Sequence, residues 1–458
     1  MNRVARRTTI ALILALVLIG GMLLFLVEFL LSADNWTVFE GNPHVYNGTN
    51  IGCGVITDRN GEILLSALDG REYAADEKIR MATIHWLGDR AGYISAPAVS
   101  YYSEEMAGYS LINGLYSYSG TGGEATMTIS AEVQKAALEA MGDRKGTVAV
   151  YNYETGEILC AVSTPNYDPD HVPDISGDES GKYEGVYLNR FTQVAYVPGS
   201  IFKLVTAGAA LEALGEDAQD LTYTCSGSYQ IGADYVTCGK SHGTISMKTA
   251  LAKSCNCYFA QLVQEIGGST LKRYVNKFQI TESLTFDGIT TRSGTFDIDG
   301  AASVEIAWSG IGQHLDLVNP ARYMTFMGVI AGGGEASEPY IVSEVRCDGH
   351  TSYTANSVST GRLMSRNTAE ILQKLMRNNV ATIYGDGYFP GLEVCAKSGT
   401  AEVGGGELPN ATFAGFVANE EYPLAFICIV ENGGAGSDVC VPIVSKVLSA
   451  CKNLIDLE

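Results

Sequence analysis

The sequence predicts an α/β (α+β) protein with one N-terminal transmembrane helix. Its 458 residues are 46% hydrophobic and 18% charged, as is typical of ordered globular chains. From about residue 131, strand-like runs stand at both ends of a long region and helical runs lie between them. This order predicts one antiparallel sheet flanked by helices.

The N-terminus predicts a membrane anchor. No charged residue occurs from Thr8 to Val27, and 20 helical residues span about 30 Å, the thickness of a bilayer core. Arg3, Arg6 and Arg7 should stay inside, so we expect a cytoplasmic tail (1–7), an anchor (8–31) and an extracellular remainder. A cleaved signal peptide is the alternative. Its apolar core is typically about 7–15 residues, and no clear cleavage site follows here.

Composition excludes several function classes. The net charge of −21 argues against a nucleic-acid partner, which needs clustered Lys and Arg. No P-loop or dinucleotide fingerprint occurs, and the six His form no Cys/His cluster of metal spacing, so we expect neither cofactor nor metal. Among 11 cysteines, Cys225 and Cys238 flank a predicted hairpin. A disulfide and two reduced thiols are both open for this pair.

Two regions follow the anchor. Residues 32–130 form a small β-rich region, in which Asn60-Gly61 lies between apolar flanks and predicts a hairpin. Residues 131–458 form the larger domain. Its expected helices cover 131–140, 200–214, 251–266 and 441–455, and its expected strands cover 147–153, 157–164, 392–403, 411–418 and 424–431.

The first chemical motif is Ser200-x-x-Lys203, which follows Pro-Gly and opens a predicted helix. Residues three apart share a helix face. A serine hydroxyl needs a base, and lysine can serve if burial or a nearby cation such as Lys397 lowers its pKa. The spacing alone is weak evidence, because Ser269-x-x-Lys272 and Ser449-x-x-Lys452 share it.

Two further motifs follow in order. Ser254-Cys255-Asn256 offers a hydroxyl and an amide, although Ser365-Arg366-Asn367 has the same pattern at a predicted helix N-cap. Lys397-Ser398-Gly399-Thr400 occurs once, inside a strand-like run, and combines a charge, two hydroxyls and a glycine that permits close backbone approach.

The ordered set S-x-x-K, S-x-N and K-S-G-T resembles the penicillin-binding transpeptidases. Gly54-x-Ile56-x-Asp58-Arg59-Asn60-Gly61 resembles the opening of the non-catalytic pedestal domain of the class B members, which usually have Arg where this chain has Cys53. The segments His242-Gly243 and Ile311-Gly312-Gln313 also resemble parts of the family.

The resemblance implies a peptidoglycan D,D-transpeptidase that forms an acyl-enzyme. Catalysis would use Ser200, Lys203, Ser254 and Asn256, and the D-Ala-D-Ala carboxylate would bind at Lys397, Ser398, Gly399 and Thr400. The backbone N–H groups of Ser200 and Thr400 would form the oxyanion hole. Expected partners are stem peptides as donor and amine acceptor, β-lactams, the membrane and a polytopic glycan polymerase.

Two other functions stay open. A D,D-carboxypeptidase or β-lactamase would use water in the second step, but the glutamate-bearing segment of class A β-lactamases after S-x-N is absent. A β-lactam sensor or an inactive wall-assembly scaffold would not need the chemistry. A sensor needs a route for its signal into the cell, and only about seven residues precede the membrane span. A scaffold could lose the chemistry, yet all the polar site positions are present.

Overall fold

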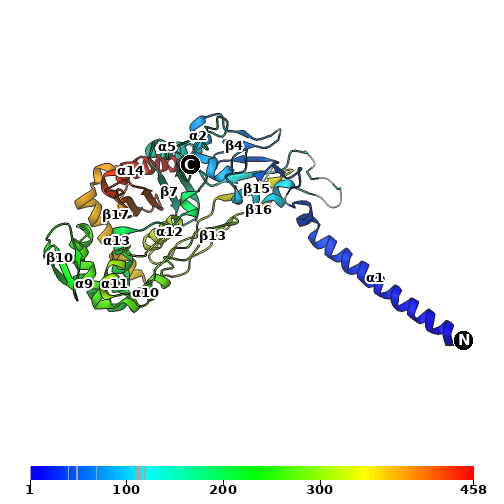
Figure 1. Ribbon diagram of the computed structural model, residues 1–458. Helices are drawn as coiled ribbons and strands as arrows, with labels where there is room; N and C mark the ends of the chain where they lie inside the picture. Colours follow the sequence, from blue (N-terminus) through cyan, green and yellow to red (C-terminus); the bar gives the residue numbers. More distant parts are fainter. Residues whose placement is uncertain are drawn as a thin grey trace.

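The computed structural model describes residues 2–39, 41–47, 50–68, 70–109, 114, 116–117 and 120–457; the other positions of the predicted tail and front region lie outside the described residues. Helix α1 (Asn2–Thr37) projects as a rod from the body, with the N-terminus at its far end (Figure 1). Within Arg3–Ala33, an 18-residue window has a mean hydropathy of 3.1, and none of that window is buried within the chain. This apolar helix fits a single-pass membrane anchor.

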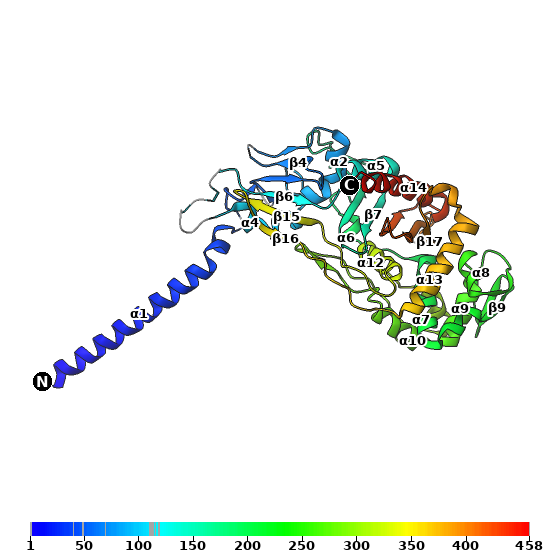
Figure 2. The ribbon, with the colours of Figure 1, turned by 180° about the vertical axis from the view of Figure 1, so that it is seen from behind.

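A mixed six-stranded sheet lies next to α1 (Figures 1 and 2). The predicted hairpin is present, with antiparallel β3 and β4 on either side of Asn60-Gly61. Two strands of this sheet come from the region assigned to the larger domain, so the predicted boundary at residue 130 separates strands that pair with one another. The order is β16 (His350–Thr354), β15 (Val342–Cys347), β6 (Glu124–Met127), β3 (Val55–Thr57), β4 (Ile63–Ser66) and β5 (Glu72–Tyr73).

The larger domain contains the predicted antiparallel sheet of five strands. Both of its faces are buried: along one strand, Ala149 and Tyr151 lie in one hydrophobic cluster, and Val148 and Val150 lie in another. The order is β17 (Val394–Ala401), β18 (Asn410–Val417), β19 (Leu424–Val430), β7 (Gly146–Asn152) and β8 (Ile158–Thr164). Strands from the two ends of the domain (146–164 and 394–430) therefore meet in one sheet, as predicted.

Helices cover both faces of this sheet (Figures 1 and 2). The amphipathic C-terminal helix α14 (Gly436–Ile455) packs with α5 (Ala131–Met141) on one face. On the other face lie α12 (Pro320–Ala331), α7 (Lys203–Leu214) and α13 (Arg366–Asn379).

A lobe of helices and short hairpins lies at the end of the body opposite α1 (Figures 1 and 2). Its hairpins pair β9 with β12 and β10 with β11, which confirms the hairpin expected between Cys225 and Cys238. The lobe contains β9 (Thr222–Cys225), β10 (Ser228–Ile231), β11 (Asp234–Thr237), β12 (Gly243–Ser246), α8 (Met247–Ala252), α9 (Asn256–Ile266), α10 (Gly268–Lys277) and α11 (Ser303–Ser309).

Two predicted helices are interrupted at the motifs. The expected helix over 200–214 begins as a 3-10 turn, η1 (Gly199–Phe202), before α7. The expected helix over 251–266 breaks between α8 and α9, where Ser254 has a φ of 53°. The remaining elements are β1 (Tyr46–Asn47), β2 (Asn50–Ile51), α2 (Glu77–Leu87), α3 (Pro97–Ser100), α4 (Ser103–Ala107), α6 (Arg190–Gln193), η2 (Glu216–Asp220), β13 (Thr285–Phe286), β14 (Ile289–Thr290), η3 (Val380–Tyr384) and η4 (Asp386–Tyr388).

Candidate active site

The turn that carries Ser200 is held by hydrogen bonds to its backbone. The amide of Gly199 donates to Gly312 O at 2.8 Å, and the Tyr323 hydroxyl donates to Ile201 O at 2.7 Å. Gly199 has a φ of 58°, and a Cβ there would lie 2.8 Å from Thr400 O. Glycine is therefore required, because the turn is left-handed and packs directly against β17. The Gly312 contact places the segment 311–313 against the nucleophile turn, and Ile311 and Gln313 line the same cleft as Ser200.

Lys203 connects the first two motifs. Its Nζ lies 3.0 Å from Ser200 Oγ, 2.7 Å from Ser254 O, 3.1 Å from Ser254 Oγ and 2.7 Å from Asn256 Oδ1. An ammonium group can donate only three hydrogen bonds, one fewer than the four oxygens around it. A neutral amine can also accept a hydrogen bond from a hydroxyl group. Complete burial of the side chain lowers the pKa of Lys203 to about 7. The neutral amine is therefore accessible near neutral pH.

Lys397 approaches the same group of atoms from β17. Its Nζ donates to Ser254 Oγ at 3.2 Å and to Ser398 O at 2.5 Å. Burial, followed by the charge of Lys203, lowers the pKa of Lys397 well below its usual range. Burial, one of the two expected causes, lowers the pKa of Lys203, and Lys397 is not among the causes of this shift. Ser254 Oγ lies between the two amines.

The S-x-N motif occupies the break between α8 and α9. Ser254 adopts the left-handed conformation, which is uncommon for a residue with a side chain and is often found at functional sites. This conformation ends α8 and directs both Oγ and the carbonyl of Ser254 toward Lys203. Asn256 opens α9, accepts from Lys203 through Oδ1 and donates through Nδ2 to Thr237 O at 2.9 Å.

The third motif lies along β17, against the nucleophile turn. A Cβ on Gly399 would lie 2.2 Å from Thr412 Oγ1, 3.0 Å from Pro198 O and 3.2 Å from Ile201 N, so this close approach needs glycine. The Tyr384 hydroxyl accepts from the amide of Ser398 at 2.8 Å and lies 3.0 Å from Ser398 Oγ. Sequence reasoning missed Tyr384, because it belongs to no motif.

These groups face a cleft of about 840 Å³ between the five-stranded sheet and the helical lobe. The cleft brings together residues of all three motifs with acidic and aromatic side chains. It is lined by Ser200, Thr237, Gly239, Ser254, Asn256, Glu305, Trp308, Ile311, Gln313, His314, Ser398, Thr400 and Glu402. Such convergence of polar groups in a concave site is typical of a substrate-binding cleft.

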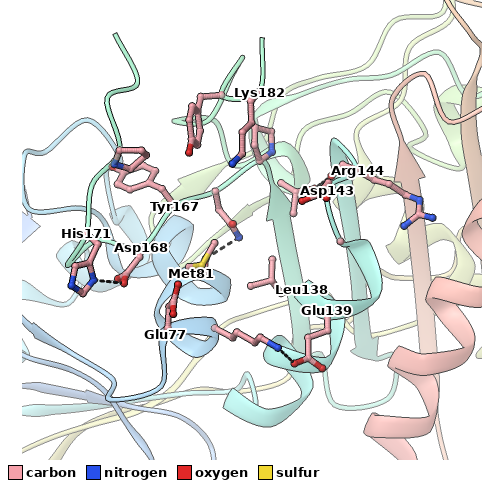
Figure 3. A pocket seen from close by; sticks show the side chains of 17 residues that line it. Glu77, Met81, Leu138, Glu139, Asp143, Arg144, Tyr167, Asp168, His171 and Lys182 are labelled. Carbon is pink, nitrogen blue, oxygen red and sulfur yellow. Dashed lines mark hydrogen bonds and ion pairs between the residues drawn. The ribbon is translucent and has the colours of Figure 1, made fainter. Parts of the chain in front are cut away.

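A second hollow, of about 1090 Å³, lies between α2, α5 and the segment after β8 (Figure 3). It is rimmed by charged side chains, including Glu77, Lys182 and the pair His171–Asp168, whose Nδ1 and Oδ2 atoms are 2.8 Å apart. None of its lining residues belongs to the three motifs. The catalytic chemistry is therefore assigned to the first cleft.

The duplicate motifs lie elsewhere in the fold. Lys272 Nζ pairs with Asp299 at 2.6 Å, and Lys452 Nζ pairs with Asp456 at 2.6 Å. Ser365 Oγ accepts from the amide of Thr368 at 3.2 Å as the N-cap of α13, as its position predicts. These three motifs have structural partners and do not line the catalytic cleft.

The sequence leaves both a disulfide and two reduced thiols open for Cys225 and Cys238. In the structure, both are free thiols. Both sulfurs face His242 Nδ1, and Cys255 lies beside them: the four ligand atoms are all within 4.8 Å of one another. The sequence has no Cys/His cluster of metal spacing, but the fold brings these four residues together. The spacing gave no signal because the residues come from separate segments, and only Cys238 and His242 are close in sequence.

Comparison with known proteins identifies the family to which the chain is similar. Residues 146–449 match the model of the penicillin-binding protein transpeptidase domain. The peptidoglycan D,D-transpeptidase PbpA of Mycolicibacterium smegmatis is 30% identical over 358 residues, which is 72% of each chain. Penicillin-binding protein A from M. tuberculosis, solved as a ceftriaxone acyl-enzyme, superimposes with a TM-score of 0.75 at 25% identity over 87% of this chain and 98% of that chain.

A further structural neighbour is a chain from a peptidoglycan synthase complex that coordinates polymerization and crosslinking. It matches with a TM-score of 0.63 and 26% identity over 72% of this chain and 63% of that chain. The family match covers more than half of the sequence and contains all three motifs. The chain therefore belongs to the penicillin-binding protein transpeptidase family.

Proposed function

We propose that this protein is a serine D,D-transpeptidase that cross-links peptidoglycan stem peptides through an acyl-enzyme on Ser200. The observation that carries the proposal is the fully buried Lys203, whose Nζ lies 3.0 Å from Ser200 Oγ. A buried amine with a lowered pKa at this distance can take the hydroxyl proton as the serine attacks.

In the first half-reaction, Ser200 Oγ attacks the carbonyl of the penultimate D-Ala. The backbone N–H groups of Ser200 and Thr400 would stabilise the oxyanion, and removing one such donor typically costs about 2.7–4 kcal/mol of barrier. The proton taken by Lys203 passes by way of Ser254 Oγ, 3.1 Å away, to the leaving D-Ala amine. The C–N bond breaks, and the acyl group stays on Ser200.

The third motif would hold the substrate during this step. The Lys397 amine and the hydroxyls of Ser398 and Thr400 would bind the terminal carboxylate of the donor peptide. Gly399 keeps the strand close to the nucleophile turn. Asn256 would bind a substrate amide while it orients Lys203.

In the second half-reaction, an amine from a neighbouring stem peptide attacks the acyl carbonyl and forms the cross-link, the ester bond to Ser200 breaks, and a proton from the amine returns to Ser200 Oγ by way of Lys203. A β-lactam would follow the same first step and leave Ser200 acylated. The M. tuberculosis neighbour, an acyl-enzyme with a β-lactam, supports this part of the proposal.

The anchor would place the catalytic domain outside the cell membrane. Three arginines precede the apolar helix, so the tail (1–7) would be cytoplasmic and residues 8–31 would span the bilayer. The front region (32–130), together with β15 and β16, would then hold the transpeptidase domain (131–458) away from the membrane. A polytopic glycan polymerase would contact the anchor and front region, a proposal supported by the likeness to the synthase-complex chain.

The test is a peptide assay with the purified full-length protein. Given a donor that ends in D-Ala-D-Ala and an amine acceptor, it should release D-Ala and form cross-linked dimers. Release of D-Ala with hydrolysis alone would indicate a D,D-carboxypeptidase. Failure to release D-Ala or to bind penicillin would indicate a scaffold.

A further inference from the structure

Four potential metal ligands converge beside the S-x-N motif. Cys225 ends β9, Cys238 follows β11, His242 precedes β12, and Cys255 is the middle residue of S-x-N. We infer that these four residues bind one Zn²⁺ in a closed tetrahedral site that fastens the hairpins of the lobe to the catalytic motif. The metal site itself does not depend on the proposed reaction, whereas its role in positioning the catalytic lysine rests on the proposed function.

The distances agree with a zinc tetrahedron. Bonds of about 2.3 Å to sulfur and about 2.0–2.1 Å to nitrogen place two sulfurs about 3.8 Å apart and a sulfur and a nitrogen about 3.5 Å apart. His242 Nδ1 lies 3.5 Å from Cys225 Sγ and 3.6 Å from Cys238 Sγ. Cys238 Sγ lies 4.0 Å from Cys255 Sγ. The four ligand atoms all lie within 4.8 Å of one another, so an ion can be accommodated with side-chain shifts of at most about 1 Å.

The surroundings of the sulfurs suit metal-bound thiolates. The amide of Tyr258 donates to Cys255 Sγ at 3.4 Å, and the backbone amides of Asn256, Lys240 and Cys257 lie near the Cys238 sulfur. Such outer hydrogen bonds orient and stabilise ligands in metal sites. Cys255 also caps α9, where the helix dipole favours a negative charge. Three thiolates and an imidazole select zinc over the hard cations Mg²⁺ and Ca²⁺.

Two simpler explanations fit less well. Reduced cysteines are common as small core residues, but core packing does not explain an imidazole nitrogen aimed at two sulfurs. A disulfide would join only two of the three thiols. The Cys238 and Cys255 sulfurs are 4.0 Å apart, about twice the length of a disulfide bond, and all three cysteines are free in the structure.

The position of Cys255 gives the metal a consequence for the active site. Its neighbours on either side, Ser254 and Asn256, both contact Lys203 Nζ. Ser254 is also in the left-handed conformation, which the surroundings must hold in place. A zinc ion that fixes Cys255 would therefore act as a positioning element for the catalytic lysine, and it would take no part in the chemical step.

The first experiment measures metal in the full-length protein, purified in detergent without air or chelator. About one zinc per chain is expected by mass spectrometry of the elements. Replacement with Co²⁺ should give thiolate charge-transfer bands and the d–d bands of a tetrahedral ion. A chain that takes up neither ion when one equivalent is supplied, or that contains a disulfide between two of the three cysteines, overturns the inference.

Variants identify the ligands. Cys225→Ser and His242→Gln, which lie outside the motif, should lose zinc. The matched controls Cys257→Ser and Cys395→Ser remove other buried free thiols and should keep it. Ser200→Ala should also keep zinc, so the metal result stands or fails separately from the transpeptidase proposal. Loss of zinc in Cys257→Ser would overturn the ligand assignment.

The positioning role is tested by acylation. Removing zinc from the wild-type protein with a chelator should slow penicillin acylation at least tenfold, and adding Zn²⁺ should restore the rate. A metal-free protein with a native circular dichroism spectrum that is acylated as fast as the zinc-loaded form would overturn this role.

Discussion

Lys203 Nζ lies 3.0 Å from Ser200 Oγ, and the lysine side chain has no solvent exposure. The two residues are three apart in sequence, but they lie in a 3-10 turn and the first turn of an α-helix. The amine is held on its other side by Ser254 and Asn256. The proposed nucleophile and base are thus positioned before any substrate binds, which would lower the cost of reaching the transition state.

Lys203→Arg should abolish the base function, because guanidinium does not deprotonate in proteins. Loss of a general base typically slows a reaction by roughly 10²–10⁴-fold. The measurement is the second-order rate constant for acylation by a fluorescent penicillin. Lys272→Arg is the matched control, since that lysine belongs to a second S-x-x-K and forms an ion pair with Asp299. Equal rates for Lys203→Arg and the wild type would contradict the assignment.

The acylation rate should rise with pH and level off above an apparent pKa of about 7, since only neutral Lys203 can accept the proton. Between about pH 7 and pH 10.5, Lys203 carries a proton in the unfolded chain but not in the folded chain. The unfolding free energy of the wild type relative to Lys203→Met should therefore increase with pH across that window. A rate independent of pH from 5 to 9 would show that another group is the base.

Gly399→Ala should separate β17 from the nucleophile turn. The new methyl group would lie 2.2 Å from Thr412 Oγ1 and 3.0 Å from Pro198 O, so the strand must shift and misplace the Thr400 amide. We expect acylation to fall about 10²-fold, the effect of losing one oxyanion donor. Gly387→Ala, with open space around its Cβ, should acylate normally. A normal rate in Gly399→Ala would exclude Thr400 from the oxyanion hole.

Tyr384→Phe should weaken binding of the donor carboxylate. It removes the acceptor for the Ser398 amide and the hydrogen-bond partner of Ser398 Oγ, at a cost of about 1–3 kcal/mol. The Michaelis constant for a D-Ala-D-Ala peptide should rise several-fold, and the melting temperature should fall. Tyr388→Phe, at a largely exposed tyrosine, is the control. If both quantities stay at wild-type values, the hydroxyl does not position Ser398.

Sequence reasoning predicted the five-stranded sheet because its strands are apolar runs with clear turns between them. It did not predict that β15 and β16 pair with the front sheet, because strand pairing between residues over 200 positions apart leaves no local signal. The break at Ser254 was also missed. The residues around it favour a helix locally, whereas in the structure Ser254 is left-handed and contacts two distant lysines.

The motifs were predicted because residue type and order carry the chemistry. The Cys/His cluster was not, because Cys225, Cys238 and Cys255 are each 13 residues or more from the next cysteine of the group. Only the hairpins β9–β12 and β10–β11, folded over the start of α9, bring them together. Tyr384 likewise reaches Ser398 only through the packing of η3 against β17.

The most direct test of the central claim is peptide mapping of the penicillin-labelled protein by mass spectrometry. The account predicts one acyl group per chain, on the peptide that contains Ser200, and no label in Ser200→Ala. A label on Ser269 or Ser449, or an unlabelled wild-type chain that is correctly folded, would contradict it.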